Sequence, residues 1–186
     1  MLSGSAGSSK KFDGLGQALT VVDNRNEPPM ATTSDKSVKI LFRYYSSALD
    51  EWVVETMWAE TIDLKRGLYK IDSIPFYGPL VASDDIVLAE YDDDEENLTY
   101  RRTVKNSGNS IITVVIMNAS HDIDEIRKVF EDLGCLSERV NDGYFSMEIL
   151  FNKNYAPIKH KLSELEEKGI IGYAEPCLSE KHRAEI

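Results

Sequence analysis

The run IITVVIM at residues 111–117 decides the fold, because its β-branched and aliphatic side chains predict a strand buried on both faces of a sheet. Asp122 and Glu125 follow with the spacing of a helix capping box. Apolar residues then recur at helical spacing until Gly134, which predicts a helix over residues 123–134. A buried strand followed by a helix therefore opens the C-terminal half.

Two strands, a helix and a last strand continue this half. Strands are predicted at 136–140 and 144–151, joined by a turn whose Asp-Gly pair favours a hairpin. The second strand alternates, so that one face should be buried by Phe145, Met147, Ile149 and Phe151. A helix with Asn154 as its cap and Pro157 in its first turn should end at Gly169, before a strand at 172–178.

The order β-α-β-β-α-β predicts a ferredoxin-like unit, with two helices on one face of an antiparallel sheet. In that topology the strands next to Cys135 and Cys177 lie at opposite edges, so no disulfide is expected between these two cysteines. Neither cysteine belongs to a CxxC motif, and no histidine cluster accompanies them. The sequence therefore gives no reason to expect a metal ion or another cofactor.

Five short strands, predicted at 38–45, 52–60, 67–71, 86–91 and 98–104, precede this unit and predict a strongly bent sheet or partial barrel. We expect the aromatic residues of this region to pack the sheet, or an exposed subset of them to form a partner-binding surface: Trp52, Trp58, Tyr69, Phe76 and Tyr77. An RNA-stacking platform is not expected, because the region largely lacks interleaved Arg or Lys. The fold class is predicted as α+β. The predicted domains are a disordered tail at 1–36, a small β-rich domain at 37–108, a ferredoxin-like α+β domain at 109–180 and a tail at 181–186.

Charge limits the classes of partner. The chain carries 32 acidic and 21 basic residues, a net charge of −11, which disfavours nonspecific binding to nucleic acid. Such a field would steer a basic protein toward the chain, although solubility alone also explains it. No apolar run approaches the roughly 20 residues that span a bilayer. We expect a soluble, cytoplasmic bacterial protein that binds neither membranes nor nucleic acid directly.

The sequence contains no recognisable catalytic arrangement. His121, His160 and His182 occur without a nucleophile or carboxylate at a suggestive spacing, so all three are predicted to lie on the surface. We therefore expect that the protein is not an enzyme. An unrecognised enzyme would be revealed by activity that depends on Arg102 or His121.

An acidic run between two predicted strands is the first candidate binding site. It lacks the ligand spacing of a calcium loop, so it is either a solvated turn or a contact for basic residues of a partner. The candidate partner-binding residues are Asp92, Asp93, Asp94, Glu95 and Glu96, with Trp52, Tyr77 and Tyr91 as anchors.

A second candidate lies where the two halves join. Arg101 and Arg102 precede the glycine-containing loop at 106–110, whose backbone N–H groups could bind a phosphate or carboxylate. This alternative predicts a small-ligand or regulatory module with an anion site formed by Arg101, Arg102 and Ser107. A plain turn between the halves is the other interpretation.

Several motifs resemble the bacterial family called domain of unknown function 4265, over roughly residues 38–178. They are WVVETMWAE at 52–60, GLYKIDSIPFYG at 67–78, SDDIV at 83–87, YRR at 100–102, SGNS at 107–110, LGC at 133–135 and GYAE at 172–175. The resemblance implies no catalytic residue. Family members tend to have His where this chain has Asn109, a departure that weakens an enzymatic interpretation further.

The size, acidity and architecture also resemble those of immunity proteins from bacterial toxin systems, including contact-dependent growth inhibition. By this analogy the partner would be a basic toxin domain, often a nuclease, whose active site the acidic protein covers. The sequence thus leads to the hypothesis of a non-catalytic acidic binding protein that acts as such an inhibitor. A small-ligand module stays open as the alternative.

Overall fold

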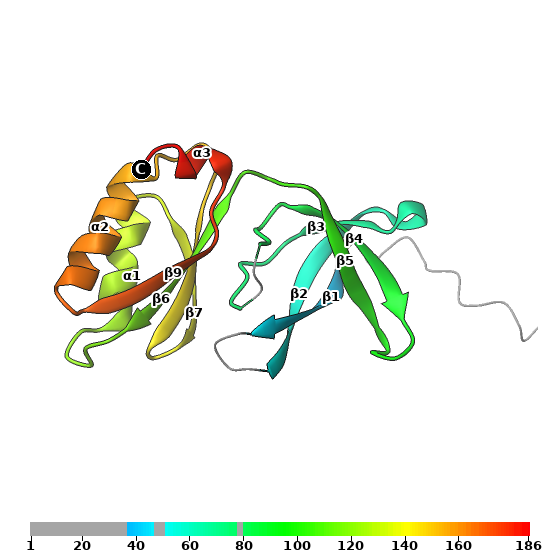
Figure 1. The fold of residues 1–186 in the computed structure, drawn as a ribbon, viewed down its shortest axis with the longest axis horizontal. Coiled ribbons are helices and arrows are strands. Elements are labelled where there is room, and N and C mark those ends of the chain that lie inside the picture. The colour runs from blue at the N-terminus through cyan, green and yellow to red at the C-terminus, as the bar shows by residue number, and fades with distance from the viewer. Residues whose placement is uncertain (1–36, 47–50, 78–79) are drawn as a thin grey trace, which may run out of the picture. The chain divides into compact units, whose positions relative to one another are not determined.

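The N-terminal half is a five-stranded barrel (Figure 1). The computed structural model describes residues 37–46, 51–77 and 80–186, so the predicted tail at 1–36 lies outside the described residues. The barrel consists of β1 (Ser37–Ser46), β2 (Glu51–Asp63), the short 3₁₀ helix η1 (Leu64–Arg66), β3 (Leu68–Ile71), β4 (Ile86–Asp92) and β5 (Asn97–Lys105). Its strands are antiparallel except where β1 and β5 meet in parallel and close it. The predicted bent sheet is therefore a closed barrel, which removes the free edges of an open sheet.

The C-terminal half is a four-stranded antiparallel sheet covered on one face by two helices (Figure 1). Its elements are β6 (Ser110–Ile116), α1 (Ile123–Asp132), β7 (Leu136–Asn141), β8 (Tyr144–Ile149), α2 (Ala156–Glu167) and β9 (Ile171–Cys177), followed by the short helix α3 (Glu180–Arg183). The strand order is β7-β8-β6-β9. Cys135 and Cys177 are free thiols at opposite edges of this sheet. The fold class is α+β, as predicted.

The Asp122 cap of α1 and the glycines just beyond both helices agree with the prediction. The Asp122 carboxylate accepts a hydrogen bond from the backbone N–H of Glu125 at 3.2 Å, at the start of α1. Gly134 follows this helix with a φ of 89°, a conformation that favours glycine. Asn154 accepts from the first backbone N–H of α2, and Gly169, with a φ of 66°, follows its end. Local sequence signals therefore mark both ends of α1 and the end of α2, whereas the N-cap position of α2 is Tyr155, whose side chain makes no capping hydrogen bond.

Each half has its own apolar core. The barrel encloses a cluster that includes Ile40, Met57 and Val87. The helices and the sheet enclose a second cluster, in which the rings of Phe130 and Phe145 lie 6.5 Å apart. Burying one such side chain stabilises the fold by roughly 1.5–3 kcal/mol, so these clusters supply most of the favourable free energy of folding.

Strand β8 is buried on both faces, not on one as predicted. Phe145, Met147 and Ile149 face the helices, whereas Ser146 and Glu148 are also almost inaccessible to solvent. The prediction that Phe151 belongs to the buried face is wrong, because the chain leaves the strand after Ile149 and the Phe151 ring is about half exposed. The second face of the sheet is therefore covered by another part of the chain.

The segment between β3 and β4 supplies this cover. The Ser146 hydroxyl donates to the Pro75 carbonyl at 2.6 Å, and the Tyr144 hydroxyl donates to the carbonyl of Phe76. The carboxylate of Glu55, in β2, accepts from the backbone N–H of Phe76 at 2.7 Å. The same short segment is thus held by hydrogen bonds from the barrel and from the sheet.

A second set of hydrogen bonds centres on the buried side chain of Asn109. Its Nδ2 group donates to Glu148 at 2.9 Å and to the carbonyl of Ser83 at 3.2 Å. Its Oδ1 atom accepts from the backbone N–H of Phe151 at 2.9 Å. One amide therefore connects the loop before β4, the start of β6 and the end of β8.

His182 corrects the prediction that the histidines lie on the surface. It is fully buried in α3, with its Nδ1 atom 2.7 Å from the hydroxyl oxygen of Ser110. That oxygen also accepts from the backbone N–H of Ser179 at 2.9 Å. Burial lowers the pKa of His182, which favours the neutral ring. The short predicted tail therefore contains a residue that anchors the C-terminus to β6.

Replacing Gly108 by alanine should destabilise the fold. Gly108 has a φ of 87°, and an added Cβ would lie 2.5 Å from the ring of Phe151. Backbone strain and the steric clash together should lower the free energy of unfolding by about 1–3 kcal/mol, measured by urea denaturation. Gly143→Ala is the matched control, because its nearest neighbour would be at 3.7 Å. Equal stability of the two variants would contradict the described packing.

Candidate functional site

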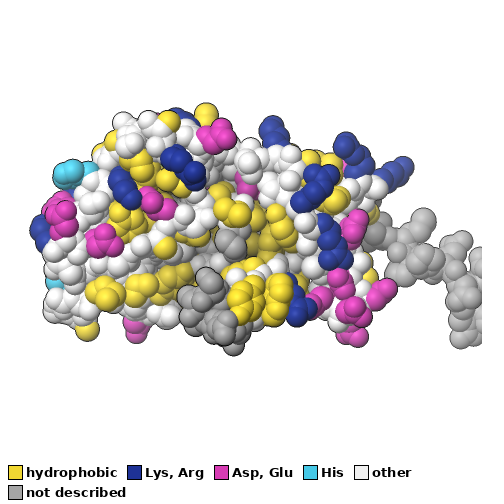
Figure 2. All heavy atoms as spheres, viewed as in Figure 1, with side chains coloured by type: hydrophobic (Ala, Val, Ile, Leu, Met, Phe, Trp, Pro, Cys, Tyr) yellow, Lys and Arg dark blue, Asp and Glu magenta, His cyan; other side chains and the backbone are white. Residues whose placement is uncertain are grey.

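The acidic run forms the turn between β4 and β5. The Asp92 carboxylate shapes it by accepting from the backbone N–H groups of Asp94 at 3.1 Å and Glu95 at 3.3 Å. Glu96 completes the turn with a φ of 52°. Figure 2 shows acidic side chains gathered over this turn, next to basic and hydrophobic side chains over β1 and β2. The turn is thus an ordered acidic projection of the barrel.

Two arginines neutralise part of this charge. Arg101 contacts Asp92 at 2.8 Å and Glu90 at 3.4 Å, and its hydrogen bond lowers the pKa of Asp92. Arg43 contacts Glu95 at 2.6 Å. Among the described residues no ion pair involves Asp93, Asp94 or Glu96, which are all exposed. These three carboxylates are the part of the turn that a partner can reach.

An aromatic surface lies beside the acidic turn. Strand pairing places Tyr45 opposite Trp52, with the two rings 5.7 Å apart edge to face. Arg43 lies over the Trp52 ring at 5.1 Å, and Lys39 over the Trp58 ring at 4.8 Å. We call this surface the outer hairpin face; it consists of Lys39, Arg43, Tyr45, Trp52, Val54 and Trp58.

The outer hairpin face corrects two predictions. Trp52 and Trp58 do not pack the barrel, because they are 60% and 50% exposed, whereas Tyr69 is in the barrel core. The expectation that this region lacks cations interleaved with its aromatics is also wrong. The cations come from β1 and the tryptophans from β2, so only the strand register brings Lys39 and Arg43 beside the indole rings.

The remaining predicted anchors have separate positions. Tyr91 is 64% exposed at the end of β4, immediately before Asp92 of the acidic turn. Tyr77 is 51% exposed and stacks on Tyr144 of β8, with ring centroids 5.7 Å apart. The contacts therefore place Trp52 and Tyr91 with the acidic turn, and Tyr77 with the sheet.

The alternative anion-site residues are not brought to one point. Arg101 is engaged with Glu90 and Asp92, and Arg102 is exposed on β5. Ser107 lines a cavity of about 720 Å³, whose other lining residues include Lys181 and Arg183. The backbone N–H of Ser107 already donates to the carboxylate of Asp85 at 2.7 Å. The loop thus binds a carboxylate, as its composition suggested, but that carboxylate belongs to the chain itself.

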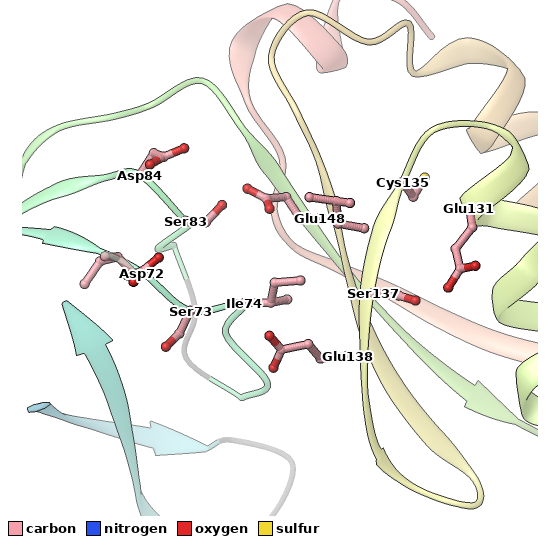
Figure 3. A pocket seen from close by; sticks show the side chains of 12 residues that line it. Asp72, Ser73, Ile74, Ser83, Asp84, Glu131, Cys135, Ser137, Glu138 and Glu148 are labelled. Carbon is pink, nitrogen blue, oxygen red and sulfur yellow. The ribbon is translucent and has the colours of Figure 1, made fainter. Parts of the chain in front are cut away.

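A second cavity, of about 440 Å³, has a strongly acidic lining (Figure 3). We call it the acidic cavity; it is lined by Ile71, Asp72, Ser73, Ile74, Ser83, Asp84, Glu131, Cys135, Leu136, Ser137, Glu138 and Glu148. In Figure 3, Glu138 and Glu148 extend from the sheet toward the segments that carry Asp72, Ser73 and Ser83. None of the lysines and arginines among the described residues lines it.

Glu148 is the carboxyl group of the acidic cavity whose pKa is raised most clearly. Only 5% of it is exposed. Burial raises its pKa to about 7, and the negative charges of Asp84 and Glu138 add to this effect. Sequence reasoning missed this residue, although a glutamate between Met147 and Ile149 of a buried strand was a usable signal.

The described cysteines are poor nucleophiles. Burial raises the pKa of Cys135 to about 12 and that of Cys177 to about 11, so both thiols stay protonated at neutral pH. Among the described residues, no group of three or more His, Cys, Asp and Glu side chains is arranged to hold a metal ion. None of the described helices is long and apolar enough to cross a membrane.

The family model described as domain of unknown function, DUF4265, matches residues 55–173. The chain belongs to the DUF4265 family. The match covers β2 to β9, and therefore includes both the acidic turn and the acidic cavity. The family resemblance expected from the sequence motifs is thus confirmed.

One solved structure is similar to this DUF4265 member. It is a crystal structure of a hypothetical protein from Neisseria gonorrhoeae, with a TM-score of 0.67 and 26% sequence identity. The similarity covers 76% of this chain and 94% of the other chain. No curated protein matches the sequence.

Glu148→Gln should change how stability depends on pH. Because the pKa is raised from 4.5 to about 7, the folded state holds this proton more tightly than the unfolded state. The resulting stability, up to about 3 kcal/mol, is present in full at low pH and is lost as the pH rises through about 7. Urea unfolding from pH 5 to pH 8 should therefore show wild type losing stability relative to the variant.

The control for this measurement is Glu166→Gln, which replaces an exposed carboxylate at the end of α2. Its pH dependence should follow that of wild type. A stability difference between wild type and Glu148→Gln that stays constant over this pH range would contradict the raised pKa.

Proposed function

We propose that this protein is a non-catalytic, cytoplasmic binding protein whose partner is a basic protein. The binding surface is the acidic turn together with the outer hairpin face. One observation carries the proposal: Arg43 contacts Glu95 at 2.6 Å and lies over the ring of Trp52 at 5.1 Å. The turn and the aromatic side chains therefore form one continuous surface.

The chemistry of this surface suits protein recognition. Trp, Tyr and Arg are the residues that most often dominate binding energy at protein interfaces, and here Trp52 contacts both Tyr45 and Arg43. Desolvating the half-exposed indole of Trp52 would provide affinity. The exposed carboxylates Asp93, Asp94 and Glu96 would accelerate association with a positively charged partner.

An inhibitor of a toxin is the form of this function that we favour. A basic nuclease domain binds polyphosphate at its active site, and an acidic projection can imitate that ligand while neighbouring aromatic residues fix its position. The chain would then act as an immunity protein. Its C-terminal half is proposed to be ferredoxin-like, which the strand order β7-β8-β6-β9 and the two helices on one face support.

A small-ligand or regulatory module is the second candidate function. The observation that favours it is the cavity of about 720 Å³, to which Ser107, Lys181 and Arg183 contribute. Asp85 already accepts a hydrogen bond from the Ser107 N–H, and Lys181 contacts Glu185 at 2.7 Å. Because carboxylates of the chain already engage these groups, the cavity attracts an anion only weakly. Binding of a basic protein therefore agrees better with the geometry.

Affinity capture from the source bacterium tests the proposal with two matched double variants. Asp93→Lys with Asp94→Lys alters the acidic turn, and Glu166→Lys with Glu167→Lys alters the exposed end of α2. Each pair changes the net charge by +4, from −11 to −7. We expect wild type and the α2 variant to retain the same basic protein, released by high salt, and the turn variant to lose it.

Trp52→Ala measures the contribution of the indole contact to affinity, apart from the electrostatic attraction by the acidic turn. It should weaken binding of the captured protein about 10-fold or more, mainly through faster dissociation, as measured by surface plasmon resonance.

In the capture experiment, equal retention of the partner by the turn variant and the α2 variant would contradict the proposed surface. Failure of wild type to retain any protein would favour the small-ligand module instead.

A further inference from the structure

We propose that the acidic cavity binds an organic cation, a guanidinium or ammonium group, which is held by the carboxylate of Glu148. This cavity is lined by none of the residues of the acidic turn or of the outer hairpin face. The inference therefore adds a ligand site that is independent of the surface proposed for the protein partner.

Glu148 is positioned as an acceptor with spare capacity. The Nδ2 group of Asn109 donates to Oε1 of Glu148 at 2.9 Å. Asn109 is itself held in place by its hydrogen bonds with Ser83 and Phe151. No second hydrogen bond and no ion pair reaches Glu148 from the described residues. Its carboxyl group lies at the wall of the cavity and points toward Ser83 (Figure 3). A buried carboxylate can accept about four hydrogen bonds. The N–H groups of a bound ligand would therefore fill the acceptor positions that Asn109 leaves open.

The surroundings of Glu148 favour a positive ligand. Asp84 and Glu138 act on it electrostatically, and both make ionisation of Glu148 harder. Two cations contact the lining from outside it: Lys70 contacts Asp84 at 3.7 Å, and Arg127 contacts Glu131 at 3.9 Å. None of the described lysines or arginines acts electrostatically on Glu148. A bound cation would remove this repulsion, and binding would therefore be coupled to loss of the Glu148 proton.

The rest of the lining indicates an organic group. Ile71, Ile74 and Leu136 provide apolar contacts for a hydrocarbon chain or the flat face of a guanidinium. The hydroxyl oxygens of Ser73, Ser83 and Ser137 each accept one hydrogen bond within the chain, from Trp58, Asn109 and Arg127, and each can accept one more from a ligand. The volume of about 440 Å³ is at the lower end of the range for small-ligand sites, so it fits a short amine.

Isothermal titration calorimetry with agmatine and putrescine as probes tests this site on the full chain. Wild type should bind at least one of them with a measurable Kd. Affinity should rise from pH 6 to pH 8, with protons released to the buffer, because the cation competes with the Glu148 proton. Absence of binding by both probes would overturn the proposal.

Variants locate the binding site. Glu148→Gln should weaken binding at least 10-fold and abolish the proton release, whereas the exposed Glu166→Gln should behave as wild type. Glu138→Gln, on the exposed edge strand β7, should weaken binding by a smaller factor and does not depend on the folding of a buried variant. Unchanged affinity in Glu148→Gln and Glu138→Gln would show that any binding occurs elsewhere and would overturn the proposal.

The bound guanidinium or ammonium group can belong to a free metabolite or to an arginine side chain of a protein. Titration with a short arginine-containing peptide, alongside agmatine, distinguishes these sources. Tighter binding of the peptide would assign the cavity to an arginine side chain, and tighter binding of agmatine would assign it to a free amine. Both results support the cation site.

Discussion

The buried amide of Asn109 is the interaction on which the rest of the structure depends. It donates to Ser83 and Glu148 and accepts from the backbone N–H of Phe151, so that it holds three segments that are far apart in the sequence. Each of these groups would cost about 1–3 kcal/mol if it were buried without a partner. A single side chain therefore couples the barrel to the sheet and positions Glu148, the buried carboxyl group in the wall of the acidic cavity.

Two carboxylates likewise accept hydrogen bonds from the backbone of distant loops. Glu55 accepts from the N–H of Phe76, and Asp85 accepts from the N–H groups of Ala82 and Ser107. These acidic residues serve the fold by satisfying loop backbone that would otherwise be buried unpaired. The acidic excess thus has two parts. Some carboxylates hold loops, and the exposed ones of the turn and the cavity lining remain available to a positively charged partner or ligand.

Most elements could be predicted because their signals are local. The β-branched run at 111–117, the Asp122 cap and Gly134 define β6 and α1 without reference to the rest of the chain. The predicted positions of the five N-terminal strands were close as well. Closure of the barrel depends on β1 meeting β5, a contact between distant residues that no short pattern encodes.

The candidate sites were harder to predict for the same reason. The outer hairpin face depends on the register that pairs Lys39 with Trp58 and Arg43 with Val54, beside Trp52. His182 belongs to a short polar segment, and only its contact with Ser110 explains its burial. Glu148 was detectable as a charge within an apolar strand, but its role requires Asn109, which lies in the loop before β6. Long-range pairing, rather than composition, assembles the outer hairpin face and the acidic cavity.

Chemical denaturation of Asn109→Ala, followed by two signals, tests the coupling between barrel and sheet most directly. Both tryptophans of the chain, Trp52 and Trp58, lie in the barrel, whereas α1 and α2 belong to the C-terminal half, so fluorescence and circular dichroism report on different halves. In wild type and in the exposed control Asn106→Ala, the two transitions should coincide. Asn109→Ala should unfold at lower urea, with the transitions separated. Coincident transitions at the wild-type midpoint would contradict the role assigned to Asn109.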